Sequence, residues 1–293
     1  MNTLDKLLHE FSDVVKMKLG SGEPVDIEPL KIRLKTNAIP VRAKPRKYPL
    51  EKRVFISRYV GELKRMGFVK PAISPEWISM PLVVPKKPPA MFRMAIDYRA
   101  INAATQSTSW PMPNIDAELV DTRKAKRFAL IDFCSSFWQA PLDPDSQAFY
   151  AFMAANGVVM PTRTPQGGCN SAANFQEKVE PCFIELRDHY KAWLDDFLIF
   201  AESEDQLLQI LRRFFEICRT RRLIISLPKS EFFLTKAQWC GRIIDEHGVR
   251  FNPKNISGIM NSNAPLTAGE LCEYVHAVSW MSSSIPRFSE RVA

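Results

Sequence analysis

The sequence predicts an α+β fold that combines short β-hairpins with amphipathic helices. Two apolar, β-prone runs flank Asp195 and Asp196, and two further strand-like runs lie within residues 80–99. Apolar residues at helical spacing, in contrast, occupy residues 51–66 and the stretch that follows Ser203. Because side chains alternate along a strand but recur every three or four residues along a helix, the two patterns indicate a mixture of both elements.

Composition limits the classes of protein to consider. The 293 residues carry a formal charge of +8, an excess that favours a polyanionic partner without requiring one. The six cysteines form no Cys-x-x-Cys pair and the four histidines are scattered, so zinc is not expected and reduced intracellular thiols are. No segment has the pattern of a signal peptide or the length of a membrane span, which predicts a soluble intracellular protein.

The acidic pair at residues 195 and 196 is the most informative feature of the chain. The run from Tyr190 to Phe200 contains no Gly or Pro, so a tight hairpin with the acids at its tip is expected. Two carboxylates this close repel each other unless a cation lies between them. The pair therefore suits half of a site for Mg²⁺ or Mn²⁺, and a solvated Asp-Asp turn is the alternative.

The first 66 residues contain no motif for chemistry. Residues 4–11 form a short amphipathic piece, and residues 31–53 read as an extended basic strap with three prolines. The strap could touch a phosphate backbone or be a solvated linker. Residues 51–66 predict a helix that ends at Gly67 and places Phe55, Tyr59 and Leu63 in the core.

Three later segments carry polar residues at the ends of predicted elements. The strand-like runs of residues 80–99 are joined by a loop with paired lysines and lead through Arg93, so they could clamp a triphosphate or form an exposed basic hairpin. Residues 126–133 predict a strand that ends near Asp132, either a third oxygen ligand or a helix cap. Residues 164–176 pass from a Pro-Gly loop into a helix of small residues.

The last third of the chain predicts a long helix, a hairpin and a helical tail. The helix begins with a capping box from Ser203 to Gln206 and ends in a run of arginines. Residues 239–244 predict a hairpin-like pair with Gly241 at a bulge or close-approach site. From about residue 264 a helical tail continues to the end, as if the chain were a fragment.

In this order, the motifs resemble the reverse transcriptases of gypsy-type long-terminal-repeat retrotransposons. The run Phe92–Asn102 looks like the fingers strand of that family. Matches to its polymerase motifs follow in register over roughly residues 20–293: Ile131-Asp132-Phe133 with Phe137, Gln166-Gly167, Phe175-Gln176, Leu194-Asp195-Asp196 and Lys229.

The resemblance implies a right-hand polymerase with an antiparallel palm sheet backed by helices. It implies an N-terminal linker or strap at residues 1–40, fingers at 41–107 and 140–170, palm at 108–139 and 171–242, and an incomplete thumb or start of a connection at 243–293. The implied activity is RNA-directed DNA synthesis from a primer 3′-hydroxyl with dNTPs. The implied partners are an RNA or DNA template with its primer and other Pol domains, namely ribonuclease H and integrase. The implied location is the cytoplasm or a virus-like particle, with no membrane.

The resemblance also implies roles for individual residues. Asp132, Asp195 and Asp196 would hold two Mg²⁺ ions, or Mn²⁺, and carry the catalysis. The incoming dNTP would be bound by Lys87, Arg93, Phe137, Gln166 and Lys229, with Phe137 as a steric gate that excludes a 2′-hydroxyl and Lys229 as a proton donor to pyrophosphate. Primer and template would be contacted by Trp193, Trp239, Cys240 and Gly241.

Four departures from the family pattern lie beside these positions: Trp193 for Tyr, Trp138 for His, Ser136 for Gly, and Pro88-Pro89 for Lys-Asp. They concern fidelity and the mobility of the fingertip loop more than the class of activity. Two other functions stay open. One is a catalytically decayed remnant that binds nucleic acid, and the other is an RNA-dependent RNA polymerase, against which the bulky Phe137 argues.

Overall fold

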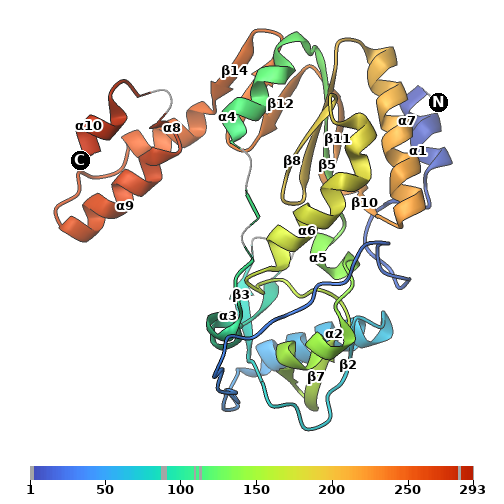
Figure 1. The fold of residues 1–293 in the computed structure, drawn as a ribbon, viewed down its shortest axis with the longest axis vertical. Coiled ribbons are helices and arrows are strands. Elements are labelled where there is room, and N and C mark those ends of the chain that lie inside the picture. The colour runs from blue at the N-terminus through green and yellow to red at the C-terminus, as the bar shows by residue number, and fades with distance from the viewer. Residues whose placement is uncertain (1–2, 87–90, 109, 112–113, 283–284, 293) are drawn as a thin grey trace.

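The computed structural model describes residues 3–86, 91–108, 110–111, 114–282 and 285–292. Within them, the chain forms an upper lobe, a lower lobe and a C-terminal arm (Figure 1). The upper lobe contains a four-stranded sheet and its helices, the lower lobe contains residues 50–106 and 140–161, and the arm contains residues 253–292. The predicted α+β class is confirmed.

The four-stranded sheet of the upper lobe is antiparallel throughout, in the order β11-β5-β9-β8. Its strands are β5 (Arg127–Asp132), β8 (Tyr190–Trp193), β9 (Asp196–Ala201) and β11 (Glu231–Leu234). The predicted strand at 126–133 and the predicted hairpin at 190–200 are thus both confirmed, and the two central strands pair along their whole length.

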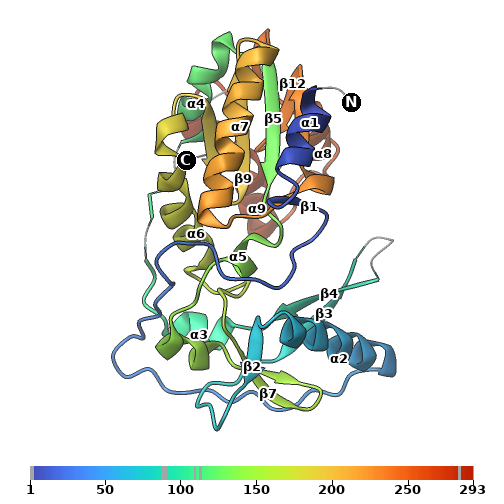
Figure 2. The ribbon, with the colours of Figure 1, turned by 90° about the vertical axis from the view of Figure 1, so that its right-hand side faces the viewer.

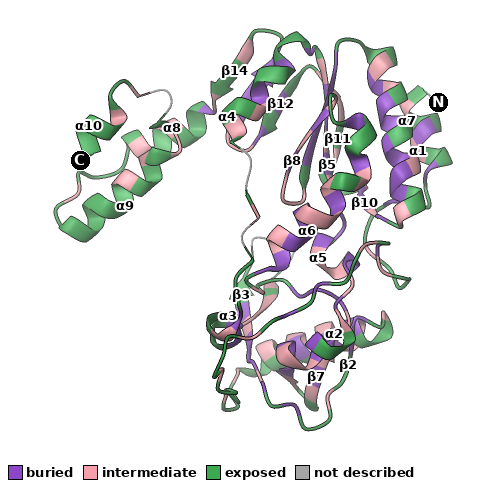
Figure 3. Ribbon diagram, viewed as in Figure 1, coloured by how far each residue is buried: buried purple, intermediate pink, exposed green. Residues whose placement is uncertain are grey.

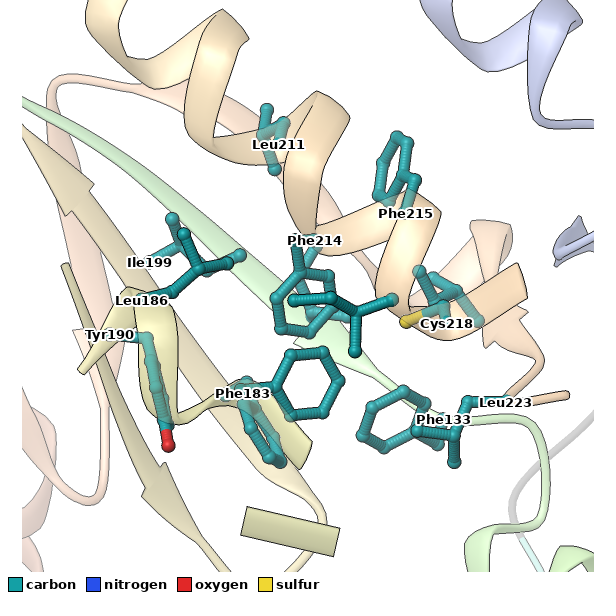
Figure 4. Packing of buried hydrophobic residues seen from close by; sticks show 14 of the residues in the cluster. Phe133, Phe183, Leu186, Tyr190, Ile199, Leu211, Phe214, Phe215, Cys218 and Leu223 are labelled. Carbon is teal, nitrogen blue, oxygen red and sulfur yellow. The ribbon is translucent and has the colours of Figure 1, made fainter. Parts of the chain in front are cut away.

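Helices cover one face of this sheet. They are α1 (Thr3–Glu10), α6 (Ser171–Val179) with the 3₁₀ turn η3 (Glu180–Leu186), and α7 (Glu204–Arg221), and Figure 2 shows α1 and α7 in front of the strands. Aromatic rings fill the space between (Figure 4). The rings of Phe183 and Phe214 are stacked with centroids 4.3 Å apart, and those of Phe133 and Phe197 meet edge to face at 5.3 Å. Buried aromatic pairs of this kind stabilise beyond the area that they remove from water.

A second, three-stranded sheet packs on the opposite face. It consists of β12 (Lys236–Trp239), β13 (Arg242–Asp245) and β14 (Gly248–Phe251), beside α4 (Ile115–Glu118) and η1 (Leu119–Lys124). Phe128, Leu198, Trp239 and Ile244 form the apolar contact between the two sheets. Gly241 lies in the two-residue turn between β12 and β13, with φ of +46° at Cys240 and +74° at Gly241, so the irregularity is a tight turn and not a bulge. The close approach that was the alternative is confirmed, because a Cβ at Gly241 would lie 3.3 Å from Asn255 Nδ2.

The lower lobe is built on α2 (Leu50–Arg65), which ends before Gly67 as predicted. Against it lie a three-stranded sheet of β2 (Val69–Pro71), β6 (Phe152–Ala154) and β7 (Gly157–Pro161), and a hairpin of β3 (Pro81–Pro85) and β4 (Phe92–Ile96). Short turns α3 (Arg99–Ala104) and η2 (Pro144–Tyr150) complete it. Of the predicted core stripe on α2, Leu63 is buried, whereas Phe55 and Tyr59 are half-buried at its edge.

The N-terminal segment joins the two lobes. After α1, the strand β1 (Val15–Lys16) pairs in parallel with β10 (Ile225–Ser226), and the chain then crosses to the lower lobe without a regular element. Isolated bridges fix the crossing, among them Leu30 to Leu142 and Arg42 to Ile78. The extended strap predicted for residues 31–53 is therefore confirmed as far as Pro49, and α2 begins at the next residue.

At the start of α7, the side chain of Ser203 accepts from the backbone N–H of Gln206, as predicted. The reciprocal bond differs from the prediction, because Gln206 Oε1 accepts from the N–H of Glu202 and not of Ser203. The C-terminal arm contains α8 (Pro253–Met260), α9 (Ala268–Ser279) and α10 (Phe288–Val292), and no described residue of these helices is buried (Figure 3). Among the described residues, no helix is long and apolar enough to span a bilayer.

Candidate active site

The acidic pair lies at the tip of the β8–β9 hairpin. Trp193 and Asp196 are the last paired residues, so Leu194 and Asp195 form a two-residue turn. Leu194 has a φ of +58°, a conformation that costs about 1–3 kcal/mol for a non-glycine residue and therefore needs support from its surroundings.

Gln176 provides that support. Its side chain is 1% exposed on α6, and its Oε1 accepts from the N–H of Leu194 at 3.1 Å. The amide nitrogen of the same side chain donates to the carbonyl of Ala192 and to Glu180. A buried amide of α6 thereby holds the chain that leads from β8 into the turn that carries Asp195.

Asp132 and Asp196 lie on the same face of the sheet. They are Cα partners at the end of the β5–β9 ladder, and residues directly opposite in an antiparallel pair project to the same side. The alternation of the strands agrees, because Ala129, Ile131, Phe197 and Ile199 face the helices while Phe128, Leu130, Leu198 and Phe200 face the second sheet. The register therefore brings together two carboxylates that are 64 residues apart in the sequence.

The carboxylates also act on each other electrostatically. Desolvation, repulsion from Asp195 and repulsion from Asp132, in that order, raise the pKa of Asp196. Desolvation also raises the pKa of Asp132, against the lowering effect of Lys229, and repulsion from Asp195 adds to the rise. The site thus holds negative charge that a cation would relieve.

Neighbouring polar groups form hydrogen bonds with the residues that carry the carboxylates. Ser136, which is 3% exposed on the short helix α5 (Ser136–Gln139), donates to Asp195 Oδ2 at 2.7 Å. The ammonium of Lys229, at the end of η4 (Leu227–Lys229), lies 3.0 and 3.1 Å from the two carboxylate oxygens of Asp132. Ser230 Oγ accepts from the backbone N–H of Asp132 at 3.1 Å.

The donor set suits a hard divalent cation. Among the described residues, no three His, Cys, Asp or Glu side chains are placed so that they share one metal ion. Ser136 and Lys229 are hydrogen-bonded to Asp195 and Asp132. Mg²⁺, however, commonly takes only one or two protein carboxylates and completes its shell with water and substrate phosphates. Asp132 and Asp196, opposite each other with Asp195 adjacent, supply such oxygens.

A cavity of about 480 Å³ lies beside the hairpin tip. Its lining brings together five of the residues that the sequence singled out: Arg93, Phe137, Gln166, Asp195 and Lys229. They come from both lobes, since Arg93 is on β4 and Phe137 on α5. Asp132 and Asp196 lie beside the cavity and are not part of its lining. Lys87, predicted as a nucleotide ligand, lies outside the described residues.

The four residues predicted to contact primer and template lie on the far side of the hairpin. Trp193 ends β8 and is half-buried, and Trp239 is only 4% exposed and donates from its indole to the carbonyl of Asp196 at 3.3 Å. Cys240 and Gly241 form the β12–β13 turn and are partly accessible. Of the four, Trp193, Cys240 and Gly241 are accessible enough to contact a ligand.

Sequence reasoning missed several polar residues that shape the site. Ser136 was noted only as a departure from the family, and Gln176 only as part of a matching pair. Asn102 also contributes, because its amide donates to the carbonyl of Gly167 at 2.9 Å and accepts from the N–H of Cys169 at 3.0 Å, which fixes the loop that bears Gln166. The partners are distant in sequence, so no local signal pointed to them.

Two larger hollows lie away from the hairpin tip. One, of about 760 Å³, lies in the lower lobe between residues 45–57 and the β6–β7 turn, and the other, of about 700 Å³, lies between η1 and β14. Neither is lined by any of the three carboxylates, so the smaller cavity at the hairpin is the candidate active site.

An antiparallel sheet with carboxylates at its hairpin tip, a second lobe across one cavity and a C-terminal arm together define a right-hand polymerase fold. Comparison with known protein families shows which polymerases of this class the chain is related to. The family described as "Reverse transcriptase (RNA-dependent DNA polymerase)" matches residues 84–252, more than half of the chain. The chain therefore belongs to the reverse transcriptase family, and the resemblance to gypsy-type elements is confirmed.

The curated relatives are polyproteins much longer than this chain. The chain is 29% identical over 296 residues to the retrovirus-related Pol polyprotein from transposon opus of Drosophila melanogaster, which covers 98% of this chain and 29% of that protein. The polyprotein from transposon 297 of the same organism is 29% identical over 87% of this chain and 24% of its own length. The enzymatic polyprotein of cauliflower mosaic virus (strain Strasbourg) is 29% identical over 78% and 35%, respectively. The chain thus spans between a quarter and about a third of these relatives.

Solved structures agree on the fold. A foamy viral protease-reverse transcriptase in complex with double-stranded DNA matches with a TM-score of 0.84 at 24% identity, over 99% of this chain and 51% of that one. The same viral enzyme in complex with an RNA/DNA hybrid matches with a TM-score of 0.80 at 24% identity, over 96% and 38%. The predicted right-hand architecture is confirmed by these neighbours.

Proposed function

We propose that the chain is an RNA-directed DNA polymerase that extends a primer 3′-hydroxyl with dNTPs on an RNA or DNA template. The observation that carries this proposal is the pairing of Asp132 with Asp196 at the end of the β5–β9 ladder, beside Asp195 in the turn. In a member of the reverse transcriptase family, this convergence supports a working nucleotidyl-transfer centre.

Asp132, Asp195 and Asp196 are the proposed ligands of two Mg²⁺ ions, with Mn²⁺ as a substitute. When bound, such ions lower the pKa of a coordinated hydroxyl and neutralise the charge that develops on transferring phosphates. The protein's own part is to hold the oxygens in place. Gln176 fixes the turn, and Ser136 and Lys229 occupy Asp195 and Asp132 until a substrate arrives.

The cavity beside the hairpin is the proposed dNTP site. Arg93 and Lys229 lie on its lining and are both exposed, so they can neutralise a triphosphate. Lys229 also carries the proton that a departing pyrophosphate needs. Gln166 projects from a loop held by Asn102 and is proposed to lie against the sugar and base, and Lys87 keeps its predicted role as a triphosphate ligand.

Phe137 is the proposed steric gate. Its ring lines the cavity and packs edge-on against Phe175 with centroids 5.9 Å apart, so its position is set by the core. A ring fixed in this way leaves little room for a 2′-hydroxyl and favours deoxynucleotides. An RNA-dependent RNA polymerase must accept the 2′-hydroxyl, so a gate at Phe137 favours a DNA polymerase over that alternative.

The lobes follow the same assignment. The lower lobe lies within the proposed fingers (41–107 and 140–170), the upper lobe holds the palm (108–139 and 171–242), and the C-terminal arm lies within the proposed thumb (243–293), whose first residues pair with the second sheet as β13 and β14. Primer and template are proposed to lie along the second sheet, in contact with Trp193, Cys240 and Gly241, while Trp239 supports the carbonyl of Asp196 from behind. Ribonuclease H and integrase domains elsewhere in a parent polyprotein, and an intracellular location, stay predictions.

Incorporation of labelled dTTP on poly(rA) with an oligo(dT) primer tests the proposal. We expect Mg²⁺-dependent extension by the wild type, none with EDTA, and none by Asp195→Ala, which should still bind primer-template. Binding without extension by the wild type would favour the decayed remnant. Equal extension by Asp195→Ala would contradict the assigned centre.

A further inference from the structure

The N-terminal segment is fixed against the body of the protein on both sides of residues 17–21. On one side, β1 pairs with β10, and the N–H of Ile225 donates to the carbonyl of Val14 at 2.7 Å. On the other side, Arg163 donates to the carbonyl of Gly22 at 2.6 Å and Arg222 to that of Pro24 at 3.0 Å. The stretch between these anchors is therefore held in one place.

That stretch forms part of the wall of the candidate active site. Met17, Lys18 and Leu19 line the same cavity of about 480 Å³ as Asp195 and Lys229. The strand pairing explains why, because β10 leads directly into η4 and Lys229, so the residues that follow β1 lie beside that turn. The sequence pointed to no chemistry in residues 1–40, and it gave no sign that this segment would border the cavity.

Lys18 adds charge to a cavity that is already positive. The charged residues of the lining are Lys18, Lys86, Arg93 and Lys229 against the single carboxylate of Asp195. Lys18 is exposed and forms no ion pair with any described residue. Lys229, in contrast, is bound to Asp132. A concave surface with such an excess of cations attracts a polyanion, and a free ammonium beside it can bind phosphate oxygens directly.

We propose that Lys18 is a further nucleotide-binding residue, whose ammonium contacts the polyphosphate of the incoming dNTP and the pyrophosphate that leaves. Through it the N-terminal segment, and not only the two lobes, forms the nucleotide site. The inference rests on the proposed function, because it needs a dNTP in this cavity.

The test compares Lys18→Ala with Lys31→Ala, which removes the same charge from an exposed position of the same segment outside the cavity. Each protein is bound to a primer-template with a dideoxy-terminated primer, and the affinities for the next dNTP and for pyrophosphate are measured with Mg²⁺ by titration. We expect Lys18→Ala to weaken both about fivefold, as for loss of one charged hydrogen bond at an accessible site. Lys18→Arg should restore them, and Lys31→Ala should match the wild type.

The two possible failures are distinguishable in this experiment, because the dideoxy terminus prevents incorporation of the dNTP and its binding is measured alone. If the wild type binds no dNTP, the proposed function fails. If the wild type binds dNTP and Lys18→Ala binds it as tightly, only the role of Lys18 is overturned. Melting temperature and affinity for primer-template, measured on the same samples, should be unchanged in all three variants. A fall in the melting temperature of Lys18→Ala alone would assign the residue to folding, and a fall in its affinity for primer-template alone would assign it to primer-template binding.

Discussion

Asp132 and Asp196 stand opposite each other as Cα partners on β5 and β9, with both side chains on the face that looks toward the second sheet. The alternation of side chains along each strand allows Asp132 and Asp196 to face the same way, but the register of β5 with β9 is what places them opposite each other. A shift of one residue would turn one of the two carboxylates into the aromatic core beneath the helices. The pairing that forms the candidate metal site is thus the same pairing that buries the core.

This arrangement should cost the protein stability when no cation is present. The pKa values of Asp132 and Asp196 are raised above 3.8, so their ionised forms are less favourable in the folded than in the unfolded chain. The cost is absent below that value, grows as the pH rises through the folded-state pKa, and is complete above it. Asp196→Asn should therefore raise the melting temperature in EDTA at about pH 7.5 and leave it unchanged at about pH 3.5.

Differential scanning fluorimetry at the two pH values measures the effect. Asp188→Asn, at a side chain that is 84% exposed, is the matched control and should show no gain. A lower melting temperature of Asp196→Asn at neutral pH would mean that the carboxylate stabilises the fold, contrary to this account.

Phe137 should set the choice of sugar. Phe137→Val removes a ring that lines the cavity, so we expect ribonucleotide incorporation to rise by one or more orders of magnitude relative to deoxynucleotide incorporation. Single-nucleotide extension with dTTP and UTP gives the ratio. Phe149→Val, also a half-buried ring but outside the cavity, is the control. Unchanged discrimination in Phe137→Val would remove the gate role.

Gln176 should matter for both folding and activity. Gln176→Ala leaves the N–H of Leu194 without its acceptor beside a turn that is already strained, which should lower the free energy of unfolding by about 2 kcal/mol. The rate of extension should fall more than the affinity for dNTP, because the loss of Gln176 displaces Asp195 and leaves the cavity that binds the dNTP in place. Denaturant titration and single-turnover kinetics check the two effects. Gln238→Ala, at an exposed strand position, should change neither, and a wild-type extension rate in Gln176→Ala would refute the positioning role.

Arg242 should orient the C-terminal arm. Its guanidinium is 5% exposed, donates to Asp116, and lies 3.7 Å from the ring centroid of Phe251 and 5.1 Å from that of Trp280. Because stacking needs the planar group, Arg242→Lys should loosen the arm by about 1–2 kcal/mol.

Hydrogen exchange over residues 268–279 measures that loosening, and it should rise in Arg242→Lys. Arg250→Lys, which alters the ion pair of Arg250 with the buried Asp245 in the same sheet, serves as control. Equal exchange in both variants would show that other contacts position the arm.

Much of the fold could be predicted from local patterns. The uninterrupted apolar runs around the acidic pair predicted the β8–β9 hairpin, and the spacing of Phe55, Tyr59 and Leu63 before Gly67 predicted α2. Such elements are encoded within a dozen or so residues, where periodicity and turn residues suffice. For Gly241 the expected close approach is present, beside Asn255, whereas the expected bulge is a tight turn, because both irregularities call for positive φ.

The supporting groups of the site could not be predicted in this way. The hydrogen bond from Ser136 to Asp195 joins residues 59 positions apart, and the bonds of Asn102 to the loop at Gly167 join residues about as distant. The same is true of Lys18, which reaches the cavity only because β1 pairs with a strand more than 200 residues later. Contacts of this kind depend on the tertiary fold, and no local pattern records them.

Binding of Mn²⁺, followed by electron paramagnetic resonance, tests most directly whether Asp132, Asp195 and Asp196 hold divalent cations. The titration is done on the complex with a dideoxy-terminated primer-template and dNTP. The wild type should immobilise two ions per chain, and Asp132→Asn and Asp195→Asn should each immobilise fewer, with Asp188→Asn like the wild type. Immobilisation of two ions by every variant would contradict the assignment of these carboxylates.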